Sequence, residues 1–142
     1  VRRLAYGGVE AEISAQLDRA IDAVADDILA GDYGRLLQVR ALQAFRGEPD
    51  RPLEARMEEA RPLFEATVTL LPRASESWMN LAFIALLEGD CDAAARFAEE
   101  SARVAGGDRI PAQARLFRDD MRETSAAGLC AESSARFAAG FK

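Results

Sequence analysis

The sequence contains no histidine, and every basic residue except Lys142 is an arginine. Without histidine the chain lacks the most common general base, the Ser–His and Cys–His nucleophile pairs, and the usual nitrogen ligand of zinc. Glycine-rich phosphate loops, nucleophile elbows and paired-cysteine metal motifs are missing as well. We therefore expect a protein that is not an enzyme and that carries neither a metal nor a cofactor.

Long apolar runs and an excess of positive charge are also missing. No stretch approaches the roughly 18 consecutive apolar residues of a membrane-spanning helix, so we expect no membrane span in this chain. The net charge of −6 argues against a nucleic-acid partner, because the phosphate backbone attracts basic surfaces. The first residue is Val1 rather than methionine, which leaves open a processed or truncated chain that has lost a signal peptide or membrane anchor.

Proline is scarce, with five in 142 residues, and 49% of the residues are hydrophobic. Because alanine is abundant and is the best helix former, this composition predicts a single all-α domain with a continuous core. Gly31-Asp32 and Gly89-Asp90 read as breaks between helices. We expect about seven helices in one domain over residues 1–142: an N-terminal helix over 9–30, a divergent repeat over 33–72 with a loop insertion at 47–54, the clearest repeat over 75–106, and capping helices over 110–140.

Two local signals refine these boundaries. Ser75 is a helix-capping residue type at the start of the clearest repeat, while Gly89 can end a helix in the left-handed conformation and Asp90 can cap the next one. Pro62 lies inside an apolar helical pattern, where it would cost about 3 kcal/mol. The helix that precedes Pro72 is therefore expected to start late, near Glu58, or to be kinked.

The repeat over 75–106 resembles a tetratricopeptide repeat, a helical hairpin with a period of 34 residues. Ala60, Thr67 and Pro72 precede Ala94, Ser101 and Gly106 by that same period of 34 residues. Three positions depart from the family pattern, namely Ala85, Cys91 and Gly106, where a tyrosine, an aromatic residue and a proline are usual. The residues that carry the resemblance are Trp78, Leu81, Ala82, Gly89, Asp90, Ala94 and Ser101. The resemblance implies an α–α superhelix of antiparallel helical hairpins.

In tetratricopeptide proteins, the first helix of each repeat lines a concave groove that holds a peptide of a partner protein. The resemblance implies that the groove residues of this chain are Glu76, Met79, Asn80, Phe83 and Leu87. Asn80 matches an asparagine that holds the ligand backbone in some members, which suits an amide that both donates and accepts; the alternative is an exposed side chain or a cap for a neighbouring helix. The basic residues that clamp a terminal carboxylate in one subfamily are replaced here by Met79 and Phe83.

A second apolar face on this helix comprises Met79, Phe83 and Leu87. A helix that is apolar on two sides is either covered by another helix or offers a contact surface. We expect a non-enzymatic protein–protein interaction module that binds a helix or extended peptide of a partner. The alternative is a structural or oligomerising subunit, such as an extracytoplasmic domain of a bacterial envelope complex or a homodimer, in which this face is buried against another chain.

The two cysteines, Cys91 and Cys130, each begin an expected helix. If the helices stack in a row, these two helix starts are neighbours and a disulfide is geometrically possible. A disulfide would indicate an oxidising compartment such as the periplasm. The alternative is two buried thiols that pack as small apolar side chains, which is compatible with the cytoplasm.

Overall fold

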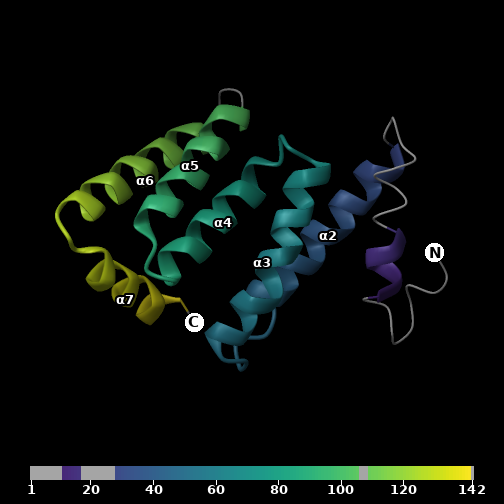
Figure 1. Cartoon of the computed structure of the whole chain (residues 1–142), viewed down its shortest axis with the longest axis horizontal. Helices are drawn as coiled ribbons and strands as arrows, with labels where there is room; N and C mark the ends of the chain where they lie inside the picture. The colour runs from purple at the N-terminus through teal and green to yellow at the C-terminus, as the bar shows by residue number, and fades with distance from the viewer. Residues whose placement is uncertain (1–10, 17–27, 106–108, 142) are drawn as a thin grey trace.

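The computed structural model describes residues 11–16, 28–105 and 109–141 of the chain, and these residues form helices and turns with no strand. A helix over residues 11–16 is followed by six more, which gives the seven helices that the sequence predicts (Figure 1). The six are α2 Ile28–Arg46, α3 Leu53–Leu70, α4 Ser75–Leu87, α5 Cys91–Ala105, α6 Arg109–Ala126 and α7 Cys130–Gly140. The prediction of an all-α fold is confirmed.

Helices that are neighbours in the sequence pack mostly as antiparallel pairs. The pairs α2–α3, α4–α5 and α5–α6 share the most extensive contacts, and α4 also lies against α3 (Figure 1). Short connections favour this arrangement because the chain must turn back directly after each helix. The exception is α7, which contacts α4 more than it contacts α6. None of the described helices combines the length and the apolar character needed to cross a bilayer.

Two clusters of buried apolar side chains hold the helices together. The first joins α2, α3 and α4, and its centre is Phe45 and Phe64, whose rings meet edge to face with centroids 6.1 Å apart. The second joins α4, α5 and α6 and includes Ala85, Ala94 and Met121. Because each cluster draws on at least three helices, no single hairpin could bury these side chains by itself.

The turn between α4 and α5 has the expected chemistry. Gly89 adopts the left-handed conformation with φ of +81°, and Asp90 caps α5 because its Oδ1 accepts a hydrogen bond of 2.9 Å from the Ala93 backbone amide. The expected cap at Ser75 is wrong: Ala74 holds the cap position of α4, with no side-chain hydrogen bond. Ser75 instead exchanges hydrogen bonds of 2.8–3.0 Å with Ser101, which ties the start of α4 to the end of α5.

Two helix starts differ from the expectation. The predicted break at Gly31-Asp32 is wrong, because α2 begins at Ile28 and continues through both residues. A late start near Glu58 is also wrong, since α3 begins at Leu53 and contains Pro62 in its interior. Proline has no backbone N–H, so the backbone carbonyl four residues earlier in α3 lacks its helical hydrogen bond. Pro62 is exposed, so water can reach that carbonyl. Most of the expected N-terminal helix over 9–30 lies outside the described residues.

Gly34 lies where α2 comes close to the end of α3. A Cβ atom at Gly34 would be 2.5 Å from Cγ of Leu71, so an added methyl group would force Leu71 to move. A Cβ atom at Gly31, one turn earlier, would meet only the guanidinium end of Arg35 at 3.8 Å among the residues that the structure describes. The two glycines of one helix therefore provide a matched pair that separates helix propensity from packing.

We expect Gly31→Ala to raise the free energy of unfolding by up to about 1 kcal/mol, because alanine favours helix over glycine. Gly34→Ala should lower it by about 1–3 kcal/mol, because overpacking outweighs that gain. Urea unfolding followed by circular dichroism measures both changes. A Gly34→Ala protein as stable as Gly31→Ala would contradict the close packing of α2 on α3.

An ion-pair network joins α5 to α6. Glu99 accepts a hydrogen bond of 2.7 Å from Arg118 and a longer one of 3.4 Å from Arg122. The bond from Arg118 is the main reason that the pKa of Glu99 lies below its ordinary value; partial desolvation opposes it, and the charges of both arginines add to it. A lowered carboxyl pKa stabilises the fold above the unfolded-state pKa, and this contribution is lost as the pH falls through the folded-state pKa.

Replacing Arg118 by glutamine should therefore raise the pKa of Glu99 toward that of a free glutamate. The carboxyl ¹³C chemical shift of Glu99 as a function of pH gives the pKa of Glu99 in the wild type and in the variant. Arg115→Gln on the same helix is the control, since Arg115 is exposed and should leave Glu99 unchanged. An identical Glu99 titration in wild type and Arg118→Gln would show that the network does not persist in solution.

Candidate functional site

The residues expected to bind a partner lie on α4, which packs against α3, α5 and α7. Most of α4 belongs to the core, and its buried residues are Ser77, Asn80, Leu81, Ala82, Ile84, Ala85 and Leu86. Only a narrow strip of the helix remains for other contacts. Of the five expected residues, Glu76, Met79, Phe83 and Leu87 lie on this strip, whereas Asn80 belongs to the buried set.

The C-terminal half of the strip is covered by α7. The ring of Phe83 meets Phe117 of α6 edge to face at 5.4 Å and Phe137 of α7 at 5.6 Å. The hydroxyl of Ser134, also on α7, donates a hydrogen bond of 3.1 Å to the Leu87 carbonyl. Phe83 of α4 therefore packs against both α6 and α7, so α7 covers this half of α4.

The side chain of Asn80 is buried and bonded within its own helix. It is 9% exposed, and its Nδ2 donates a hydrogen bond of 2.9 Å to the Glu76 carbonyl one turn earlier in α4. The amide is therefore engaged with its own helix, an arrangement that the sequence did not indicate. Along the same strip, Met79 is half-buried and Glu76 is exposed.

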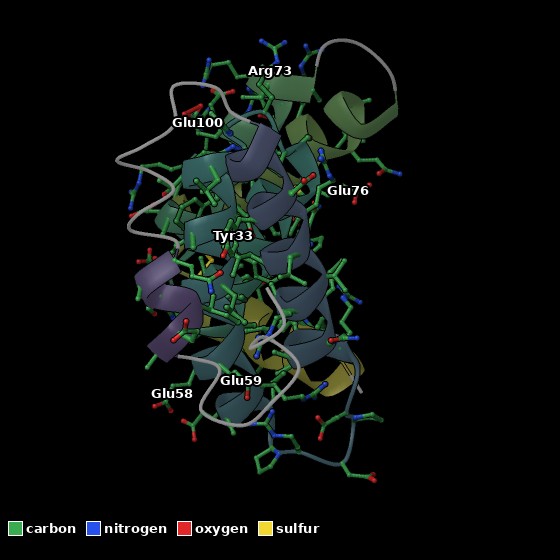
Figure 2. All side chains as sticks on the ribbon, turned by 90° about the vertical axis from the view of Figure 1, so that its right-hand side faces the viewer. Tyr33, Glu58, Glu59, Arg73, Glu76 and Glu100 are labelled. Atoms are coloured by element: carbon green, nitrogen blue, oxygen red, sulfur yellow. A yellow bond between two sulfur atoms is a disulfide. The ribbon has the colours of Figure 1, made fainter. Side chains whose placement is uncertain are left out.

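An open hollow of about 590 Å³ lies at the start of α4. Its walls are Gln38 of α2 and residues 70–76, which connect α3 to α4. Of the five expected residues, only Glu76 lines it. Figure 2 shows Arg73 and Glu76 at this end of the molecule and Glu58 and Glu59 toward the other. The hollow therefore has one basic and one acidic side chain among otherwise uncharged walls.

The helix α7 is attached at both of its ends. Cys130, its first residue, forms a disulfide with Cys91 at the start of α5, with the two Cα atoms 5.9 Å apart. Beyond its last turn, Phe141 packs against Phe45 of α2 at 4.9 Å and against Phe137 at 5.7 Å. No residue of α7 itself is fully buried. The helix lies across one end of the structure, from the α4–α5 turn toward the end of α2 (Figure 1).

Sequence reasoning missed the aromatic contacts that place α7 on α4. Phe137 and Phe141 are four residues apart, and this spacing was the available signal for a common helix face. Nothing in the sequence indicated that this face would meet Phe83 rather than α6. Across the part of the chain that the structure describes, no group of three or more acidic or cysteine side chains is placed to hold a metal ion.

Removing the disulfide should destabilise the fold substantially. The bond joins residues 39 apart, so a Cys91→Ala, Cys130→Ala double variant should lose about 4 kcal/mol in the free energy of unfolding, since a closed loop of this length restricts the unfolded chain. Alanine is preferred over serine because Cys91 is 2% exposed. Urea unfolding of wild type with and without dithiothreitol should show a similar loss.

A thiol titration of the unreduced protein in denaturant provides the companion measurement. We expect no reactive thiols before reduction and two after it, because both cysteines are in the bond. Two reactive thiols in the unreduced protein would contradict the crosslink.

No family model matches this chain, and comparison with curated proteins and with solved structures found no similar protein.

Proposed function

We propose that this chain is a non-enzymatic protein-binding module of the tetratricopeptide-like type. Its binding surface would be the strip of α4 that carries Met79, Phe83 and Leu87, and its partner would be an amphipathic helix of another protein. One observation carries the proposal: α7, a helix of the same chain, lies on this strip through aromatic contacts. A surface that accepts one helix in this manner has suitable chemistry for another.

The contacts of α7 indicate which partner helix would suit the surface. α7 has 11 residues and none of them is fully buried, and helices of this length are marginal in isolation. Its aromatic contacts come from Phe137 on Phe83 and from Phe141 on Phe45. A partner helix that presents an aromatic side chain in the place of Phe137 would reproduce the contact with Phe83 and compete with α7.

The part of the surface that α7 leaves uncovered is available without any displacement. The hollow beside Glu76 is open, and Gln38 of α2 forms one of its walls. Leu36 and Val39, which are 38% and 53% exposed, lie within one helical turn of Gln38. Neither side chain lines the hollow, but exposed apolar side chains on the same helix favour contact with a partner segment.

The disulfide supports an oxidising compartment, such as the periplasm, as the place where this module works. Cytosolic reductants keep most thiols reduced, whereas bonds between cysteines persist in the periplasm and outside the cell. The crosslink fixes the start of α7 next to the α4–α5 turn. The proposed surface would therefore meet its partner with α7 tethered.

A display library of helical peptides, selected against the immobilised full-length chain, tests the proposal. Selected peptides should bind Met79→Glu at least about tenfold more weakly than wild type, because the new carboxylate would lose its water in an apolar contact. Calorimetric titration gives the Kd values. Arg96→Glu, an exposed position on α5, is the matched control and should leave the affinity unchanged.

Peptides that bind Met79→Glu and wild type equally well would place the contact elsewhere and contradict the proposal. The alternative is a structural or oligomerising role, and its supporting observation is Leu116 of α6, which is 71% exposed. A dimer in sedimentation velocity that Leu116→Glu dissociates, with no peptide enriched by the selection, would favour that alternative.

A further inference from the structure

The α2–α3 loop and the end of α7 enclose a second, smaller hollow of about 270 Å³. Its lining residues are Arg46, Pro49, Arg56, Gly140 and Phe141. They come from the end of α2, the loop after it, the first turn of α3 and the end of α7. Two guanidinium groups therefore line one small space, although the chain as a whole has a net charge of −6.

Arg56 is a buried cation that forms no ion pair with the described residues. It is 4% exposed, and its Nη1 donates a hydrogen bond of 3.1 Å to the Phe45 carbonyl. Its Nε is enclosed and has no hydrogen-bond partner. None of the ion pairs among the described residues includes Arg56. Because a buried charge is unfavourable unless a counter-charge and hydrogen bonds compensate it, this guanidinium lacks part of its expected surroundings.

Arg46 is the second cation, and it too is without an ion pair among the described residues. Its guanidinium carbon lies 4.9 Å from the centre of the Phe141 ring and 5.4 Å from that of Phe45. The guanidinium of Arg56 lies 5.9 Å from the Phe141 ring. Contact with an aromatic face orients a guanidinium, but it leaves the N–H donors along the guanidinium edge available.

A nearby arginine shows what these two lack. Arg51, in the same loop region, forms an ion pair of 2.8 Å with Glu59. The loop also contains Glu48 and Asp50, which are exposed and do not line the hollow. Acidic side chains are thus close in the sequence, yet none of those described is paired with Arg46 or Arg56.

We propose that this hollow binds an oxyanion, that is, a carboxylate or phosphate group, between the guanidinium groups of Arg46 and Arg56. Guanidinium donors form paired, charge-assisted hydrogen bonds with the oxygens of both groups. Two cations exclude a metal ion as the occupant, and about 270 Å³ holds one small group rather than a large cofactor. Neither Met79 nor Phe83 of the proposed helix-binding strip lines this hollow, so the two surfaces have different lining residues.

The test is a titration of the full-length, ¹⁵N-labelled protein with inorganic phosphate and, separately, with acetate. Sodium chloride is withdrawn in step so that the ionic strength stays constant. The arginine Nε–Hε signals report on the guanidinium groups directly. We expect the signal of Arg56 to shift along a saturable curve with at least one of the two anions, and to yield a Kd.

Arg46→Gln should weaken that Kd at least about tenfold, because it removes one set of charge-assisted hydrogen bonds. Arg46 is exposed, so the core is retained in this variant. The matched control is Arg96→Gln on α5, where the side chain is also exposed and should leave the Kd unchanged. Comparing Arg46→Gln with Arg96→Gln separates binding at the hollow from a general effect. Phosphate stabilises proteins through exclusion from their surface, and both variants would show that effect equally.

The two anions distinguish the possible ligands. A saturable shift with acetate alone identifies the ligand as a carboxylate, and one with phosphate alone identifies it as a phosphate group. A saturable shift with both anions identifies a site that binds oxyanions without preferring carboxylate or phosphate. The proposal is overturned if neither anion gives a saturable shift of Arg56, or if the curve is the same in Arg46→Gln as in wild type.

Discussion

The close packing of α4 in the interior is the constraint on which the remaining structure depends. Ala82 and Ala85 of α4 and Ala94 and Ala98 of α5 are almost completely buried, and small side chains let helix backbones approach each other. α4 then has apolar residues on more than one side, so a single neighbour cannot cover it. α3 covers one side and α5 another, and α7 returns to cover part of the rest.

That need explains why α7 leaves the pattern of sequential pairs. A helix that continued the row would pack mainly on α6, and Phe83 would then lose the ring of Phe137. α7 is short and has no fully buried residue, so its packing alone stabilises its position weakly. The Cys91–Cys130 disulfide adds a covalent attachment to α5 that stabilises this position. The same few contacts therefore hold α7 in place and cover part of the strip of α4.

The sequence predicts the fold class and the α4–α5 turn well, but it predicts some helix boundaries and the packing of α7 poorly. The all-α fold and the Gly89-Asp90 turn follow from short-range chemistry, since left-handed glycine and capping aspartate act within one turn. The expected break at Gly31-Asp32 was wrong because a glycine inside a helix costs only about 1 kcal/mol relative to alanine, and other contacts can compensate for this cost. The packing of α7 on α4 was not predictable, because Phe137 meets Phe83 across 54 residues of sequence.

Phe141 links the two surfaces that we propose to be functional. Its ring contacts Phe137 and Phe45, which seat the end of α7, and it also lies under the guanidinium groups of Arg46 and Arg56. An anion that binds this hollow only when Phe141 is in place would stabilise the seated position of α7, since a ligand favours the state that binds it. By reciprocity, a partner helix that displaced α7 would weaken the anion site. Two surfaces with different chemistry would then be coupled through one aromatic ring.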